Sequence, residues 1–246
     1  MTSWTLHKNK THEQLDSVLI YPEWNVNGIC QEPGIERTTQ VTTLAQVLKE
    51  NGYHTIHCGK AHFGAIDTPG EDPLRMGFEV NIAGHAAGSP ASYYGKENFG
   101  NKTDGKNPPA AVPGLEKYHG TDTFLSEALT LEAEKALDDA QKSDKPFFLY
   151  MAHYAVHTPI QPDMRFYQKY IDKGLPPVEA AYATLVEGMD KSLGDLMDYL
   201  EEKNLQENTV ILFMSDNGGL AAHTRAGQLH TCLLYTSPSP RDRSLS

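Results

Sequence analysis

Residues 43–64, TLAQVLKENGYHTIHCGKAHFG, predict a helix, a strand and a polar loop in immediate succession. The first part has apolar residues at helical spacing behind a threonine that can cap the helix, either Thr42 or Thr43. Gly52 stands where a glycine commonly ends a helix. The run YHTIHC (53–58) is rich in β-forming residues, and the glycine-flanked loop GKAHFG follows it. The stretch therefore predicts one helix–strand–loop unit.

Two further units of the same kind follow along the chain. A helix predicted over about 122–141 precedes PFFLYMA (146–152), and a long helix over about 178–203 precedes TVILFMS (209–215). Both short runs are continuously apolar, which is typical of strands buried on both faces. Repeated alternation of helix and strand predicts an α/β fold, with a largely parallel central sheet and helices on both faces.

Residues 65–120 separate the first unit from the second and are rich in Gly, Pro, Asn and aromatic residues. We expect a long irregular excursion with little regular structure, and loops of this length in a compact domain usually carry function. Its aromatic residues Tyr93, Tyr94 and Phe99 either pack in the interior, which we favour, or line a pocket for a sugar ring or an aryl group.

Composition excludes several classes of protein. The 246 residues carry a net charge of −11, which argues against a protein that binds nucleic acid through a basic face. No apolar run approaches the roughly 18 residues of a membrane span. The three cysteines are too few and too scattered for a disulfide framework or a cysteine-based zinc site.

The last fifteen residues, CLLYTSPSPRDRSLS (232–246), differ sharply in composition from the rest and resemble a translated sequencing adapter. We expect residues 1–231 to form a partial catalytic domain and residues 232–246 to be a non-native tail. The beginning of the chain is polar and contains no predicted strand that could start a sheet. We therefore expect the sequence to begin in the middle of a domain.

Polar side chains cluster after each of the three predicted strands. Lys60 and His62 follow the first strand, His157 follows the second, and Asp216 and Asn217 follow the third. Each cluster alone also fits a turn, a cap or a packed histidine. Because ligand sites gather at the carboxyl ends of parallel strands, the three clusters together predict a shared site.

The residue types of this predicted site suit the hydrolysis of a sulfate or phosphate ester. Asp216 and Asn217 offer oxygen ligands for a hard cation such as Ca²⁺ or Mg²⁺. In an extended segment Lys60 and His62 share one face, where they would meet an anionic tetrahedral group. His157 could act as a general acid, since imidazole titrates near neutrality. Spacing alone does not choose between sulfate and phosphate, and it reveals no nucleophile.

Three ordered blocks of the sequence resemble the type I sulfatase family. TLAQVLKENGYHTIHCGKAHFG looks like the family signature, PFFLYMAHYAVHTPIQP (146–162) like its second block and TVILFMSDNGG (209–219) like its metal-binding block. The resemblance spans roughly residues 40–230. It implies the alkaline-phosphatase-like fold and hydrolysis of the sulfate monoester of a small molecule or glycan at a single divalent cation, usually Ca²⁺, with Mg²⁺ as the alternative.

The same resemblance implies a role for each candidate residue. Asp216 and Asn217 would be metal ligands, Lys60 and His62 would contact the sulfate and the nucleophile, and His157 would bind sulfate or assist the leaving group. The nucleophile of the family is a formylglycine made from a C/S-x-P/A-x-R motif, which neither Cys30 nor Cys58 matches.

Two other family features, an early Asp pair and a later lysine after DNGG, are also missing from the sequence. We therefore expect a sulfatase as the parent protein, its motif lying before Met1, and an inactive 246-residue chain. A periplasmic or secreted location is compatible with that parent.

Two alternatives stay open at this point. The first is a phosphodiesterase or phosphonate monoester hydrolase of the same superfamily, which uses similar metal and histidine blocks. The second is a non-catalytic domain that binds an anion or a carbohydrate. A formylglycine nucleophile permits either a sulfatase or a phosphonate hydrolase, whereas a Thr or Ser nucleophile favours phosphoryl transfer. Saturable Ca²⁺ binding argues against the second alternative.

Overall fold

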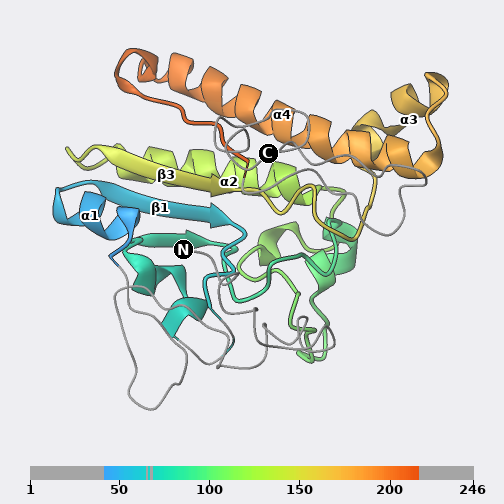
Figure 1. Ribbon diagram of the computed structural model, residues 1–246, viewed down its shortest axis with the longest axis horizontal. Coiled ribbons are helices and arrows are strands. Elements are labelled where there is room, and N and C mark those ends of the chain that lie inside the picture. The colour runs from blue at the N-terminus through green and yellow to red at the C-terminus, as the bar shows by residue number, and fades with distance from the viewer. Residues whose placement is uncertain (1–41, 65, 67–68, 216–246) are drawn as a thin grey trace, which may run out of the picture. The chain divides into compact units, whose positions relative to one another are not determined.

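The computed structural model describes residues 42–64, 66 and 69–215 (Figure 1). The chain divides into two compact units, one ending at Tyr154 and the other beginning at Ala155. Among the described residues, no helix is long and apolar enough to cross a membrane.

The first unit is built on a parallel sheet of three strands in the order β2-β1-β3. The strands are β1 (His54–Gly59), β2 (Val80–Ile82) and β3 (Phe147–Ala152). In the register of the ladders, Ile56 lies beside Val80 on one side and beside Leu149 on the other. The parallel sheet predicted from the alternation of helices and strands is confirmed for this unit.

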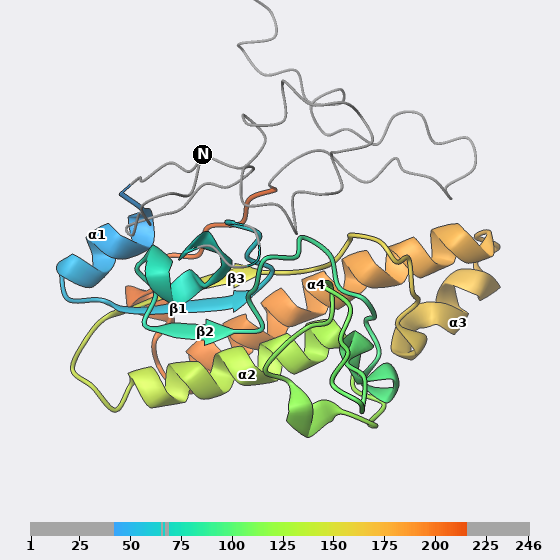
Figure 2. The same cartoon turned by 90° about the horizontal axis from the view of Figure 1, so that it is seen from below.

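Two helices cover opposite faces of this sheet, as Figure 2 shows. Helix α1 (Leu44–Glu50) begins behind Thr43, whose hydroxyl accepts a hydrogen bond from the Gln46 backbone at 3.0 Å. Helix α2 (Leu125–Ala140) lies on the other face, where the Cys58 thiol donates to the Leu129 carbonyl at 3.4 Å. Since side chains alternate along a strand, the neighbours of Cys58 on β1 face the α1 side.

Strand β3 is a strand, as predicted, but it is not buried on both faces. Its side chains are half-buried or exposed, and Tyr150 is 43% exposed. The reason is its position: β1 has a neighbour on each side and is nearly wholly buried, whereas β3 pairs with β1 at one edge of the described sheet.

The excursion over residues 65–120 is irregular, as expected, apart from short 3₁₀ turns and β2, which the sequence did not predict. It is nevertheless part of the core, because Tyr93 and Phe99 are fully buried. The Tyr93 hydroxyl donates to the carbonyl of Tyr154, and the Tyr154 hydroxyl donates to the carbonyl of Ala83. Packing, the favoured role for these two aromatic residues, is confirmed.

The second unit is mainly a pair of helices, α3 (Met164–Asp172) and α4 (Pro177–Glu202). The long predicted helix is α4, whereas α3 was not predicted. Asp163 caps α3 by accepting a hydrogen bond from the Arg165 backbone, and the Asp163 backbone donates to the Thr184 hydroxyl of α4 at 2.9 Å.

The predicted third strand, residues 209–215, is wrong in this structure. The segment has no regular secondary structure, and Val210, Leu212, Phe213 and Met214 are each more than 75% exposed. A strand exists only through hydrogen bonds to a neighbour, and no strand of the described sheet pairs with this segment.

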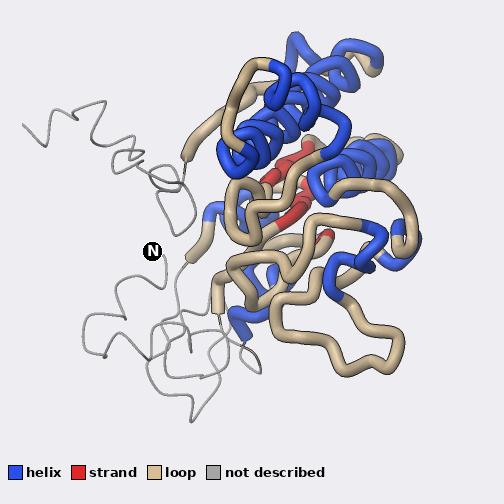
Figure 3. The backbone as a smooth tube through the Cα atoms, turned by 90° about the vertical axis from the view of Figure 1, so that its right-hand side faces the viewer, coloured by secondary structure: helices blue, strands red, loops and turns tan. Residues whose placement is uncertain are grey.

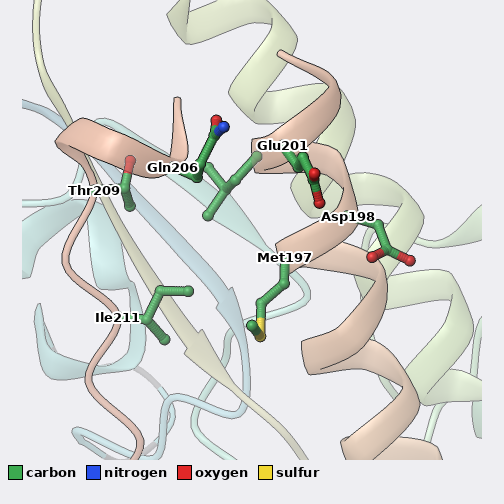
Figure 4. A pocket seen from close by; sticks show the side chains of 7 residues that line it. Met197, Asp198, Glu201, Gln206, Thr209 and Ile211 are labelled. Atoms are coloured by element: carbon green, nitrogen blue, oxygen red, sulfur yellow. The ribbon is translucent and has the colours of Figure 1, made fainter. Parts of the chain in front are cut away.

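Ile211 is partly covered because it lines a small hollow of about 200 Å³ within the second unit (Figure 4). Met197 of α4 points into the same hollow. No residue predicted for the functional site lines this hollow.

Candidate functional site

The carboxyl ends of the three parallel strands meet at one edge of the sheet, which Figure 3 views end-on. Each strand is followed there by a histidine: His62 after β1, His85 after β2 and His153 after β3. Because β1 is the central strand, His62 belongs to the middle loop of the three. This edge, with its three loops, is the candidate site that the described residues of the first unit form.

Two backbone hydrogen bonds tie the middle loop to its neighbours. The N–H of Lys60 donates to the carbonyl of Ala152 at 2.7 Å, and the N–H of His62 donates to the carbonyl of His85 at 3.1 Å. Gly59 allows the first contact, because it has a φ of +107° and a Cβ there would lie 1.9 Å from the Ala152 oxygen. The sequence therefore needs glycine at the end of β1.

His62 lies in the left-handed region, with a φ of +55°. This conformation is uncommon in residues other than glycine, although histidine adopts it more readily than most, and backbone strain of this kind concentrates at functional sites. The expectation of an extended segment over Lys60–His62 is therefore wrong at His62. Gly88 leaves room for the imidazole, since a Cβ there would lie 2.5 Å from Nδ1 of His62.

His85 is a half-buried neutral imidazole beside this loop. Burial lowers the pKa of His85 from 6.5 to about 4, so the ring is uncharged at neutral pH. Its Nδ1 atom lies 3.4 Å from the backbone N–H of Ala87, from which it accepts a hydrogen bond. Its Nε2 atom is buried and bonds to no described residue.

His153, directly after β3, has a similar environment. Burial lowers the pKa of His153 to about 4, and its buried Nδ1 atom has no hydrogen-bond partner among the described residues. Two neutral imidazoles therefore belong to the loops on either side of the middle loop. These two rings add no charge to the edge of the sheet, and the loop after β1 brings the ammonium group of Lys60 to it.

His57 and Cys58, inside β1, belong to the core rather than to the site. His57 is wholly buried among Phe63, Phe78 and Tyr150, and burial lowers its pKa to about 4. Burial also raises the pKa of the Cys58 thiol far above its ordinary value. The thiol is therefore held in its protonated form, which agrees with the prediction that Cys58 is not the nucleophile.

The other predicted site residues are placed less fully. His157 lies in the second unit and is exposed, with its Nδ1 atom 3.2 Å from both the carbonyl and the hydroxyl oxygen of Thr158. Asp216 and Asn217 lie outside the described residues. The structure thus places Lys60 and His62 on one loop, while the roles of all five residues stay predictions.

A metal site is also left as a prediction. Among the described residues, no group of three or more His, Cys, Asp or Glu side chains could hold a metal ion. The predicted ligands Asp216 and Asn217 supply carboxylate and amide oxygens, a donor set that suits a hard divalent cation.

Sequence reasoning missed His85 and His153. His153 directly follows the run PFFLYMA, so its position after a strand was a usable signal. His85 gave no such signal, because β2 has only three residues and is embedded in an irregular region. Its place at the sheet edge depends on pairing with β1.

Comparison with known proteins gives consistent results. A family model described as Sulfatase matches residues 9–232. The chain is 30% identical over 227 residues to a protein named Sulfatase from Formosa agariphila, with 76% of this chain and 40% of that protein covered. It is 28% identical over 186 residues to Arylsulfatase J from Mus musculus, covering 72% of this chain and 29% of that protein.

A solved structure resembles the fold of this chain as well. The crystal structure of Ps i-CgsB in complex with k-i-k-neocarrahexaose superposes with a TM-score of 0.59 at 32% identity. The match covers 71% of this chain and 40% of that chain. The chain thus spans well under half the length of each of these three proteins.

Proposed function

The chain belongs to the sulfatase family, and on that premise we propose that the protein to which it contributes hydrolyses a sulfate monoester to an alcohol and sulfate. The observation that carries the proposal is the loop of Lys60 and His62. Two backbone hydrogen bonds hold this loop at the carboxyl edge of a parallel sheet, where ligands bind in open α/β folds.

The charge and hydrogen-bonding capacity of each candidate side chain suit it to a different role in this reaction. The ammonium group of Lys60 would attract the sulfate group and stabilise the negative charge that develops on it. His62, held in a strained conformation by its loop, would donate a hydrogen bond to a sulfate oxygen or to the nucleophile. His157 would protonate the oxygen of the leaving alcohol, because an imidazole can serve as a general acid.

Two groups outside the described residues complete the proposal. Asp216 and Asn217 would hold a divalent cation, Ca²⁺ or alternatively Mg²⁺, which when bound adds positive charge to the site. The proposed nucleophile is a formylglycine contributed by a segment outside these 246 residues. The buried Cys58 does not fit that role.

An oligosaccharide is the substrate class that we propose. The relative of known structure, Ps i-CgsB, was crystallised with a neocarrahexaose, and it is 32% identical to the matched part of this chain. That similarity favours a sulfate ester on a glycan over one on a small aromatic alcohol.

Sulfate binding by the 246-residue chain tests the central claim. We expect inorganic sulfate to bind in the presence of Ca²⁺, measured by titration calorimetry, and Lys60→Ala to weaken binding about tenfold through loss of one charged hydrogen bond. Lys106→Ala, which changes an exposed lysine of the excursion, is the matched control and should leave the affinity unchanged. Equal affinities for the wild type and Lys60→Ala would contradict the proposal.

Turnover separates the sulfatase from its superfamily relatives. A longer protein that contains this chain together with the nucleophile should cleave an aryl sulfate and a sulfated oligosaccharide faster than an aryl phosphate. The 246-residue chain alone should cleave none of them. Faster cleavage of the phosphate, or metal-dependent sulfate release by the chain alone, would contradict these expectations.

A further inference from the structure

Several buried ring nitrogens in the described part of the chain lack a hydrogen-bond partner, and their settings differ. His57 Nε2 lies in the aromatic core of β1, and His119 packs edge-on against Phe99, with ring centroids 6.2 Å apart. His85 Nε2 belongs to a loop at the carboxyl edge of the sheet. Leaving a buried donor unpaired destabilises the protein, so an orphan nitrogen next to a candidate site points to a missing ligand.

The proton of His85 can be assigned to one nitrogen. Its Nδ1 atom accepts a hydrogen bond from the N–H of Ala87, so Nδ1 carries no proton. In the neutral ring the proton is then on Nε2, which is the unpartnered atom. His85 therefore presents a neutral N–H donor. Among the described residues, no hydrogen bond fixes the proton of His153 in this way.

The surroundings of His85 hold it rigidly beside the middle loop. Its carbonyl accepts from the N–H of His62, so the two loops are in direct contact. Its ring lies against Tyr154, with ring centroids 6.3 Å apart, and the Tyr154 hydroxyl bonds back to Ala83. A donor in contact with the segments that follow β1 and β3 is suited to fixing the orientation of a bound group.

We propose that His85 is a substrate-positioning residue, whose Nε2–H donates a hydrogen bond to an oxygen of the sulfate group bound by the Lys60–His62 loop. The inference rests on the proposed function and goes beyond it. A neutral donor adds direction to the site but no net charge. Lys60 therefore supplies the attraction for the anion, and His85 selects the orientation of the ester.

The experiment uses the 246-residue chain with ¹⁵N-labelled histidine, titrated with sodium sulfate in the presence of Ca²⁺ at pH 7. Long-range ¹H–¹⁵N spectra report the protonated nitrogen of each ring. We expect His85 to show the Nε2–H form before sulfate is added and its Nε2 signal to shift as sulfate binds. A proton on Nδ1, or an Nε2 signal that does not respond to bound sulfate, overturns the inference.

Three variants measure how much His85 contributes to the affinity of the chain for sulfate. His85→Phe keeps a ring against Tyr154 but removes the donor, and should raise the Kd for sulfate about tenfold. His85→Gln, which restores an N–H near the position of Nε2, should stay within about threefold of the wild type. His119→Phe removes an orphan nitrogen outside the three loops and should change nothing.

The outcomes separate this inference from the function on which it rests. If the wild type binds sulfate and His85→Phe binds it equally well, the role of His85 is overturned while the sulfate site stands. If the wild type binds no sulfate, both proposals fail for this chain.

Discussion

Strand β3 and residues 209–215 are apolar runs of similar length that end in different environments. Every residue of β3 pairs with a residue of β1, from Phe147 opposite His54 to Ala152 opposite Gly59. Residues 209–215 pair with no described strand, and Phe213 is 76% exposed. The difference teaches that an apolar run becomes a strand only where a neighbour offers its backbone groups.

The largest effect is expected from breaking the pairing of β1 with β3 at Gly59. Replacing Gly59 by Ala introduces a Cβ 1.9 Å from the Ala152 oxygen and forces a φ of +107° on a residue that disfavours it. We expect the free energy of unfolding in urea to fall by about 4 kcal/mol.

The matched control is Gly105→Ala, because Gly105 also has a positive φ but has nothing within 4 Å of an added Cβ. It should cost only about 1 kcal/mol from the backbone conformation. If the two substitutions cost the same, the tight approach of β1 to β3 is not the cause.

The second prediction compares the stability lost on truncating an apolar side chain of the paired sheet with that lost on truncating one of residues 209–215. Ile56 in β1 is fully buried, and Ile56→Ala should lower the free energy of unfolding by about 3 kcal/mol. Leu212 is 81% exposed, and Leu212→Ala should change it by less than about 0.5 kcal/mol. Thermal and urea denaturation of the two variants measure the contrast, and a large loss in Leu212→Ala would mean that residues 209–215 are packed.

Per residue, the smallest effect is a dependence of stability on pH that comes from histidines of the paired strands and their loops. His57, His85 and His153 have pKa values lowered from 6.5 to about 4 in the folded chain, whereas residues 209–215 hold no titratable side chain. Between these pH values the unfolded chain binds protons that the folded chain does not. Stability is therefore full above about pH 6.5 and falls as the pH drops towards 4.

Urea midpoints at pH 7 and pH 5 test this dependence. Each of the three histidines contributes at most about 1.4 kcal/mol per pH unit to the slope. His153→Phe should remove one of these contributions and flatten the slope. A slope unchanged in His153→Phe would show that this imidazole is not held neutral by burial.

In the first unit, some elements of the fold could be predicted from the sequence and others could not. A cap at Thr42 or Thr43, the glycine Gly52 just behind α1 and strand β1 were all predicted, because caps and dense β-forming runs act through neighbouring residues. Strand β2 was not predicted, because its three residues have no local signal and exist as a strand through pairing with β1.

The candidate site divides in the same way. Lys60 and His62 were found because they follow a recognisable strand within a glycine-flanked loop. His85 was not found, because it is 23 residues away from His62 in the sequence. The two residues are neighbours only through the backbone hydrogen bond from His62 to His85.

The sequence by itself determined the α/β class, the ends of α1 and the sulfatase family of this chain. These features follow from local capping, from hydrophobic periodicity and from residue motifs that are contiguous in the chain. Tertiary structure alone decided that β3 is a half-exposed edge strand, that residues 209–215 are not a strand, and that His85 lies next to His62. Each of these depends on which distant backbone groups become hydrogen-bond partners, and no local pattern specifies that choice.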